Sequence, residues 1–135
     1  MLKVCSRFLL AGLFLLPPLA VAVGQSQPVV TGTWTGMVAQ NKGQTGYTVV
    51  MAISANSAVT DYPELKCGGK LARVGAANGY VFFTETITRG GHDSGGSCID
   101  GTITVAPASD RLAWGWVGSH LGETYVAWGT LARKK

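Results

Sequence analysis

Glu85 is an acidic residue that stands in phase with an apolar strand face. In the run from Tyr80 to Arg89 it shares alternate positions with three large apolar residues, Val81, Phe83 and Ile87. An ionised carboxylate on a buried face costs several kcal/mol unless it is paired. Three interpretations stay open: a slipped register leaves Glu85 outside, an arginine pairs with it (Arg73, Arg111 or Arg133), or it is a polar group inside a ligand cavity.

Tryptophans in the C-terminal part of the chain are the second set of candidate contact residues. Trp114 and Trp116 share one face of a predicted strand, whereas Trp128 lies on the face opposite Ala127 and Leu131 in the next strand. If one set lines the core, the other faces outward. The outward set either covers ordinary surface or forms an aromatic patch that marks a binding surface.

The segment from His92 to Ser97 reads H-D-S-G-G-S, and its D-S-G-G letters resemble the nucleophile segment of trypsin-like proteases. A serine-protease triad needs a separate histidine base and an aspartate, both positioned by the fold. No histidine precedes His92, and His92 lies beside the serine instead. We therefore interpret the segment as a flexible loop and predict that the protein is not an enzyme. His92 and Asp93 are kept as candidate contacts with a ligand or partner.

The sequence contains no pattern typical of metal, cofactor or nucleic-acid binding. His92, Asp93 and His120 do not have the paired spacing of a zinc site, so we predict no metal and no cofactor. Basic residues form no stripe interleaved with aromatic residues, which argues against nucleic acid as a partner.

The N-terminus has the layout of a secretory signal peptide over residues 1–24. Lys3 and Arg7 precede an apolar run from Phe8 to Ala20, and small residues follow it. Cleavage would remove two of the eleven Lys and Arg residues and leave nine against seven Asp and Glu. We expect a periplasmic or extracellular protein without a membrane anchor after cleavage, made of one domain over residues 25–135.

Two cysteines remain after that cleavage, and exported chains favour disulfides. Because only one intramolecular pairing is possible, we predict a Cys67–Cys98 disulfide. It would close a loop of roughly 30 residues and contribute on the order of 3–4 kcal/mol in the chain-entropy model.

Short strands separated by turn signals account for the rest of the chain. Alternating residues predict strands from Gly32, over 47–54, around Val59, and over 66–74, 80–89, 98–107, 111–117 and 124–133. The Gly68-Gly69 pair suggests a bulge, and Asn78-Gly79 suits a type I′ turn. The spacing predicts an all-β fold, an antiparallel meander barrel of about eight strands, with a β-sandwich as the alternative.

The two ends of the predicted barrel sequence resemble the calycin pattern of lipocalins, avidins and small bacterial metalloprotease inhibitors. Gly32-Thr33-Trp34 opens the first strand and Arg133 closes the last. In those families the G-x-W tryptophan lies at the closed end of the barrel beneath a basic residue from the final strand. The resemblance implies structural roles for Trp34 and Arg133 and brings no activity with it.

Three functions are compatible with this sequence. The first is a binding domain that contacts another exported or envelope protein, as inhibitor and immunity proteins do, through loops at 41–46, 90–97 and 118–123. The second is a carrier of a small hydrophobic ligand held by Glu85 or a tyrosine. The third is a structural accessory domain of the envelope. Large side chains inside the barrel would favour the first over the second.

Overall fold

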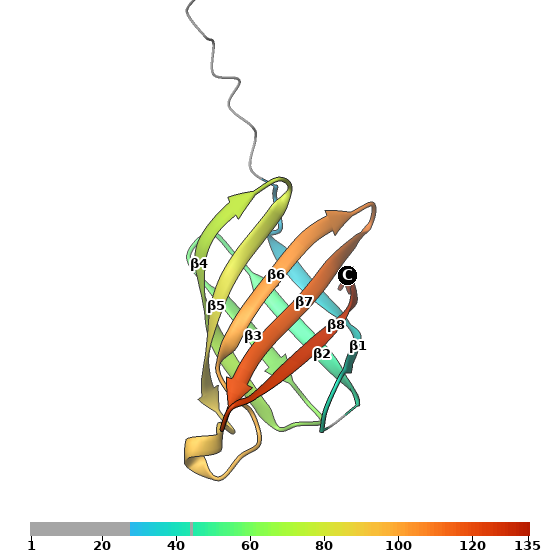
Figure 1. The fold of residues 1–135 in the computed structure, drawn as a ribbon. Helices are drawn as coiled ribbons and strands as arrows, with labels where there is room; N and C mark the ends of the chain where they lie inside the picture. The colour runs from blue at the N-terminus through green and yellow to red at the C-terminus, as the bar shows by residue number, and fades with distance from the viewer. Residues whose placement is uncertain (1–27, 44) are drawn as a thin grey trace, which may run out of the picture.

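Eight antiparallel strands form a closed barrel in which each strand pairs with its neighbours in sequence and β1 pairs with β8 (Figure 1). The computed structural model describes residues 28–43 and 45–135, so the predicted signal peptide lies outside the described residues. The strands are β1 (Gly32–Gln40), β2 (Gly46–Ile53), β3 (Ala58–Tyr62), β4 (Cys67–Ala77), β5 (Tyr80–Arg89), β6 (Gly101–Ala108), β7 (Arg111–His120) and β8 (Glu123–Arg133). One short 3₁₀ helix, η1 (His92–Ser94), lies between β5 and β6. The all-β meander barrel is thus confirmed, and closure of the sheet excludes the sandwich.

Side-chain alternation is the reason these segments form strands. In β2 the inward positions Tyr47, Val49 and Met51 are buried, and their neighbours are partly exposed. Asn78 and Gly79 connect β4 to β5 with φ angles of 51° and 84°, as the type I′ turn requires. The pairing of β4 with β5 shifts register between Gly68 and Gly69, which confirms the predicted bulge.

Two predicted boundaries were wrong. The strand expected to begin at Cys98 begins at Gly101, because Cys98 is instead bridged to Gly91 within the loop that follows β5. The loop expected over 118–123 is shorter: β7 continues to His120 and pairs it with Glu123, which leaves only Leu121 and Gly122 as the turn. Both residues of this turn have positive φ angles, so the hairpin closes tightly.

One end of the barrel is closed over Trp34. Trp34 is buried there, and its indole N–H donates to the Val30 carbonyl over 2.9 Å. The Arg133 guanidinium lies over the Trp34 ring, 4.3 Å from its centroid, and donates to the Thr31 carbonyl. This is the contact that the calycin resemblance implies, and the eight-stranded barrel is consistent with a calycin-like fold. Between this end and the opposite one, large side chains are buried in the barrel interior, among them Met51, Phe83, Leu112, Trp114 and Leu131.

The opposite end, at the bottom of Figure 1, carries the connections β1–β2, β3–β4, β5–β6 and β7–β8. We call it the open end. The longest of these connections is the β5–β6 loop, Gly90–Asp100, and the Cys67–Cys98 disulfide ties it to the start of β4 with the two Cα atoms 6.4 Å apart. The predicted disulfide therefore holds a loop against the barrel rim.

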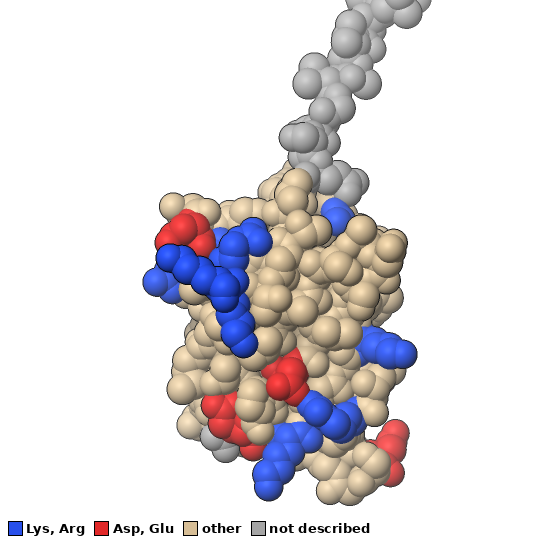
Figure 2. Space-filling view, turned by 180° about the vertical axis from the view of Figure 1, so that it is seen from behind, with Lys and Arg blue, Asp and Glu red and all other residues tan. Residues whose placement is uncertain are grey.

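Charged side chains are spread over the barrel exterior. On the face drawn in Figure 2, Lys and Arg residues lie in several separate groups with Asp and Glu residues among them. No helix within the described residues is long and apolar enough to cross a membrane.

Candidate functional site

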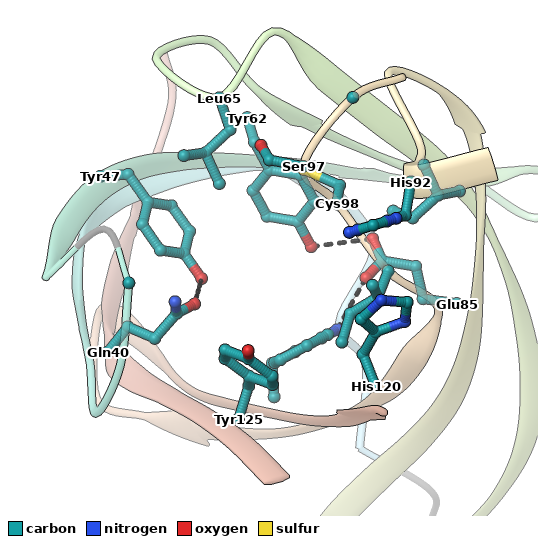
Figure 3. Close-up of a pocket in the computed structure, with 15 residues that line it drawn as sticks. Gln40, Tyr47, Tyr62, Leu65, Glu85, His92, Ser97, Cys98, His120 and Tyr125 are labelled. Carbon is teal, nitrogen blue, oxygen red and sulfur yellow. Dashed lines mark hydrogen bonds between the residues drawn. The ribbon is translucent and has the colours of Figure 1, made fainter. Parts of the chain in front are cut away.

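A cavity of about 340 Å³ lies inside the open end of the barrel; we call it the open-end cavity. Its wall combines aromatic rings, a few aliphatic side chains and one carboxyl group (Figure 3). Strands β1, β2, β3, β5, β7 and β8 contribute to it together with the β5–β6 loop. The lining residues include Gln40, Tyr47, Tyr62, Leu65, Glu85, Ile87, His92, Ser97, Cys98, Ile99, Trp116, His120 and Tyr125.

Glu85 is the carboxyl group of this wall and is only 3% exposed. The Tyr62 hydroxyl donates to its Oε1 over 2.8 Å, and the Trp116 indole N–H donates to its Oε2 over 2.8 Å. The Thr60 hydroxyl also donates to Oε1. The slipped register that would leave Glu85 outside is wrong, since Glu85 points inward from β5. All three donors are neutral, so the hydrogen bonds hold the carboxyl in place without compensating its charge.

Burial governs the protonation of Glu85. It raises the pKa of the Glu85 carboxyl above its ordinary value of 4.5, and the three hydrogen bonds offset part of this rise. The negative charge of Asp100 raises the pKa of Glu85 further. A carboxyl group in this position holds its proton to higher pH than an exposed glutamate does, and no Lys or Arg among the described residues pairs with its ionised form.

Trp116 reaches Glu85 because glycines leave room for its indole. Gly118 stands two residues along β7 on the same inward face, and Gly101 lies at the start of the neighbouring strand β6. A Cβ atom at either glycine would approach the indole of Trp116 more closely than van der Waals contact allows. The two glycines therefore fix the position from which the indole N–H meets the carboxyl.

Tyrosines form the wall facing Trp116. The rings of Tyr47 and Tyr62 pack edge to face with centroids 5.9 Å apart, and both are 4% exposed. Burial raises the pKa of Tyr47 to about 12, and burial together with the neighbouring Glu85 raises the pKa of Tyr62 well above its ordinary value. Both hydroxyls therefore remain protonated donors at neutral pH. Tyr47 donates to the Gln40 side chain over 2.9 Å, while Tyr62 donates to Glu85.

The β5–β6 loop supplies the remaining side of the cavity. His92, at the start of η1, stacks against His120 at the end of β7 with ring centroids 4.1 Å apart. Both imidazoles line the cavity (Figure 3). The His120 Nε2 atom is buried, and no group among the described residues forms a hydrogen bond with it. It is thus a second polar atom, beside the Glu85 carboxyl, that a molecule in the cavity could contact.

The structure separates the residues that the sequence grouped as candidate contacts. Glu85, Trp116 and His92 meet in the open-end cavity. Trp114 is buried and belongs to the filled part of the barrel, while Trp128 is 51% exposed on the outer face. Asp93 is exposed and is not part of the cavity wall.

Sequence reasoning did not identify Thr60, Tyr62 and Tyr47 as part of the site. They lie on β2 and β3 and come close to Glu85 only when the sheet closes in the observed register. One signal in the sequence is that Tyr47 alternates with Val49 and Met51 along one strand face, and a tyrosine is one of the expected ligand contacts.

Among the described residues no three His, Cys, Asp or Glu side chains are grouped so that they could hold a metal ion. In comparisons with protein-family models, curated proteins and solved structures, nothing matches this chain.

Proposed function

We propose that this protein is a non-enzymatic carrier that holds a small ligand in the open-end cavity. The observation that carries the proposal is Glu85, a carboxyl group 3% exposed in the wall of a cavity of about 340 Å³. Ligand sites commonly measure roughly 300–1,000 Å³ and combine apolar walls with a few placed polar groups. The open-end cavity has this composition.

The retention of Glu85 in the barrel interior also supports binding over a purely structural role. An apolar residue at this position would avoid the cost of burying a carboxyl group. Three side chains from three other positions of the barrel hold the carboxyl instead. A polar group that is costly to bury and faces an enclosed space is a typical ligand contact.

Export forms part of the proposal. The signal-peptide pattern over residues 1–24 and the Cys67–Cys98 disulfide both favour the periplasm or the extracellular medium. A carrier there would exchange its ligand with the surroundings through the open end.

The test combines native mass spectrometry with NMR. In native mass spectrometry, protein purified from its own source should retain a bound ligand of a few hundred daltons. In NMR, the neutral probe tryptophol should shift the indole N–H resonance of Trp116 but not those of Trp34 and Trp128. Gly118→Ala, which forces Trp116 to move, should weaken tryptophol binding several-fold. Gly75→Ala is the control, because a Cβ atom there meets nothing within 4 Å. A bare protein whose Trp116 resonance does not respond would reject the carrier function.

A second candidate, contact with another exported protein, is favoured by the outer face of β1, β7 and β8. Met37, Trp128 and Val117 are exposed there by 68%, 51% and 45%. Residues diagonal to one another on neighbouring strands lie within reach of large side chains, so the three can form one apolar patch. A protein that co-purifies with the wild type but not with Trp128→Ala would support this candidate.

A further inference from the structure

The charges around the open-end cavity indicate what kind of molecule it binds; this step rests on the carrier function proposed above. No Lys or Arg among the described residues lines the cavity, and its one carboxyl group is Glu85. Of the ion pairs formed by the described residues, Arg89 with Asp61 involves exposed side chains away from the cavity. Lys42 pairs with Glu123 beside the cavity wall, with its ammonium group 5.8 Å from the ring centroid of Tyr125. Glu85 is therefore the one acidic side chain of the cavity wall, and among the described lining residues only His92 and His120 can carry a positive charge.

The hydrogen-bond donors around Glu85 are neutral and do not neutralise the charge of its ionised carboxylate. Thr60, Tyr62 and Trp116 donate hydrogen bonds from neutral groups, and nearby Asp100 adds negative charge. An ionised carboxylate buried without a cation is costly, whereas a cation brought to it by a ligand would offset that cost. Charge-assisted hydrogen bonds are also about twice as strong as neutral ones.

The aromatic residues favour the same ligand. Tyr62 and Trp116 line the cavity at the Glu85 carboxyl. Tyr47 and Tyr125 line it on the side away from Glu85 (Figure 3). An ammonium group is attracted to the face of an aromatic ring within roughly 6 Å of its centroid. Aromatic rings also accept the apolar body of a ligand, so the cavity can hold a positively charged head and an apolar remainder at once.

We infer that the ligand of the open-end cavity is a small organic amine, bound as the ammonium ion with its charged nitrogen at the Glu85 carboxylate and its apolar body against the aromatic wall. A cavity of about 340 Å³ suits an amine with one or two rings or a short aliphatic body. Carboxylic acids are disfavoured, because their charge repels Glu85 and no lining Lys or Arg offsets it.

The experiment compares three indole probes of similar size by calorimetry at neutral pH. Tryptamine carries an ammonium group, tryptophol a hydroxyl group and indole-3-propionate a carboxylate. Tryptamine should bind at least fivefold more tightly than tryptophol, since its ammonium group forms a charge-assisted hydrogen bond where the hydroxyl group of tryptophol forms a weaker one. Indole-3-propionate should bind most weakly.

Two variants then test whether Glu85 causes the preference for tryptamine over tryptophol. Glu85→Gln should weaken tryptamine binding at least tenfold and change tryptophol binding less than threefold. Asp110→Asn, in the β6–β7 turn at the closed end, removes the same charge far from the cavity and should change neither. A folded Glu85→Gln protein should retain the dispersed indole N–H resonances of the wild type.

The dependence of tryptamine affinity on pH tests the same point. Tryptamine affinity of the wild type should rise between about pH 5 and 8 as Glu85 loses its proton, while tryptophol affinity changes little. His92 and His120 line the same cavity, and Tyr47, Tyr62 and Asp100 lie near Glu85. The same pH series with Glu85→Gln, which keeps both imidazoles, separates their protonation from that of Glu85.

The outcomes distinguish the two proposals. If tryptophol or indole-3-propionate binds as tightly as tryptamine, the amine inference is overturned and the carrier function stands. If Glu85→Gln binds tryptamine like the wild type, the inference is overturned as well. If none of the three probes binds or shifts the Trp116 resonance, both proposals fail.

Discussion

At the scale of single residues, Glu85 is where stability and binding oppose each other. Its carboxyl group is buried against neutral donors, so the folded protein without ligand is most stable when Glu85 is protonated. A bound ammonium group favours the ionised form instead. If the ligand is the proposed amine, its uptake is coupled to proton release at this residue.

The coupling predicts a specific dependence of stability on pH. The pKa of Glu85 is raised in the folded state above its ordinary 4.5, so its contribution to stability is fully present below pH 4.5. That contribution is lost as the pH rises through the folded-state pKa. Urea unfolding from about pH 4.5 to 8 should show a wild-type stability that falls relative to Glu85→Gln. Parallel curves for the two proteins would show that burial does not control the protonation of Glu85.

The sequence places Glu85 in phase with an apolar strand face but leaves open its register in the sheet and does not identify its partners. Alternation with Val81 and Phe83 puts its side chain on the buried face of β5, which the structure confirms. The donors stand 25, 23 and 31 residues away in the chain, at Thr60, Tyr62 and Trp116. Which residues face each other across a barrel depends on strand register and shear, and hydrophobic periodicity does not encode them.

At the scale of elements, the β5–β6 loop differs from the other open-end connections. It carries His92, Ser97 and Cys98 into the cavity wall, and its contacts with the barrel include the disulfide to Cys67 at the start of β4. Its glycine-rich sequence predicted an irregular loop, and the structure places only the short helix η1 within it. The cysteine count predicted which element the loop is tied to, since one pairing was possible.

Removing the disulfide should therefore affect both stability and binding. For the double variant Cys67→Ala, Cys98→Ala we expect a loss of roughly 3–4 kcal/mol in unfolding free energy, from the 31-residue separation of the two cysteines. Tryptophol affinity should fall as well, because the loop loses its covalent link to β4. Urea unfolding and calorimetry measure the two effects. Unchanged affinity in a destabilised but folded variant would mean that the remaining loop contacts suffice to form the cavity wall.

At the scale of the whole molecule, the barrel has two ends with different roles. Trp34 and Arg133 close one end, the residues around Phe83 and Trp114 fill the middle, and the cavity occupies the other end. The G-x-W sequence and the final arginine were enough to predict the closed end. The sequence did not decide between a filled and a hollow barrel, because the answer differs along the barrel axis: Trp116 lines a cavity and Trp114, two residues earlier, fills the core.

This division predicts that the closed end can be weakened without changing ligand binding. Arg133→Ala removes a cation–π contact with Trp34 and a hydrogen bond to the Thr31 carbonyl, so we expect a loss of roughly 1–2 kcal/mol in unfolding free energy. Arg133→Lys keeps the charge but not the planar guanidinium, so its unfolding free energy should lie between those of the wild type and Arg133→Ala. Lys135→Ala, at the exposed C-terminus, is the control for the loss of one positive charge.

Tryptamine affinity of Arg133→Ala should stay within about twofold of the wild type at temperatures where both are folded. The reason is that Phe83, Leu112 and Trp114, all within 3% of full burial, form a rigid packed layer between Trp34 and the cavity. A change of tenfold or more would show that the packed layer transmits the disturbance and that closure at Trp34 helps to set the shape of the open end. Unchanged affinity with lowered stability would establish that the two ends act independently, one to hold the barrel closed and the other to bind.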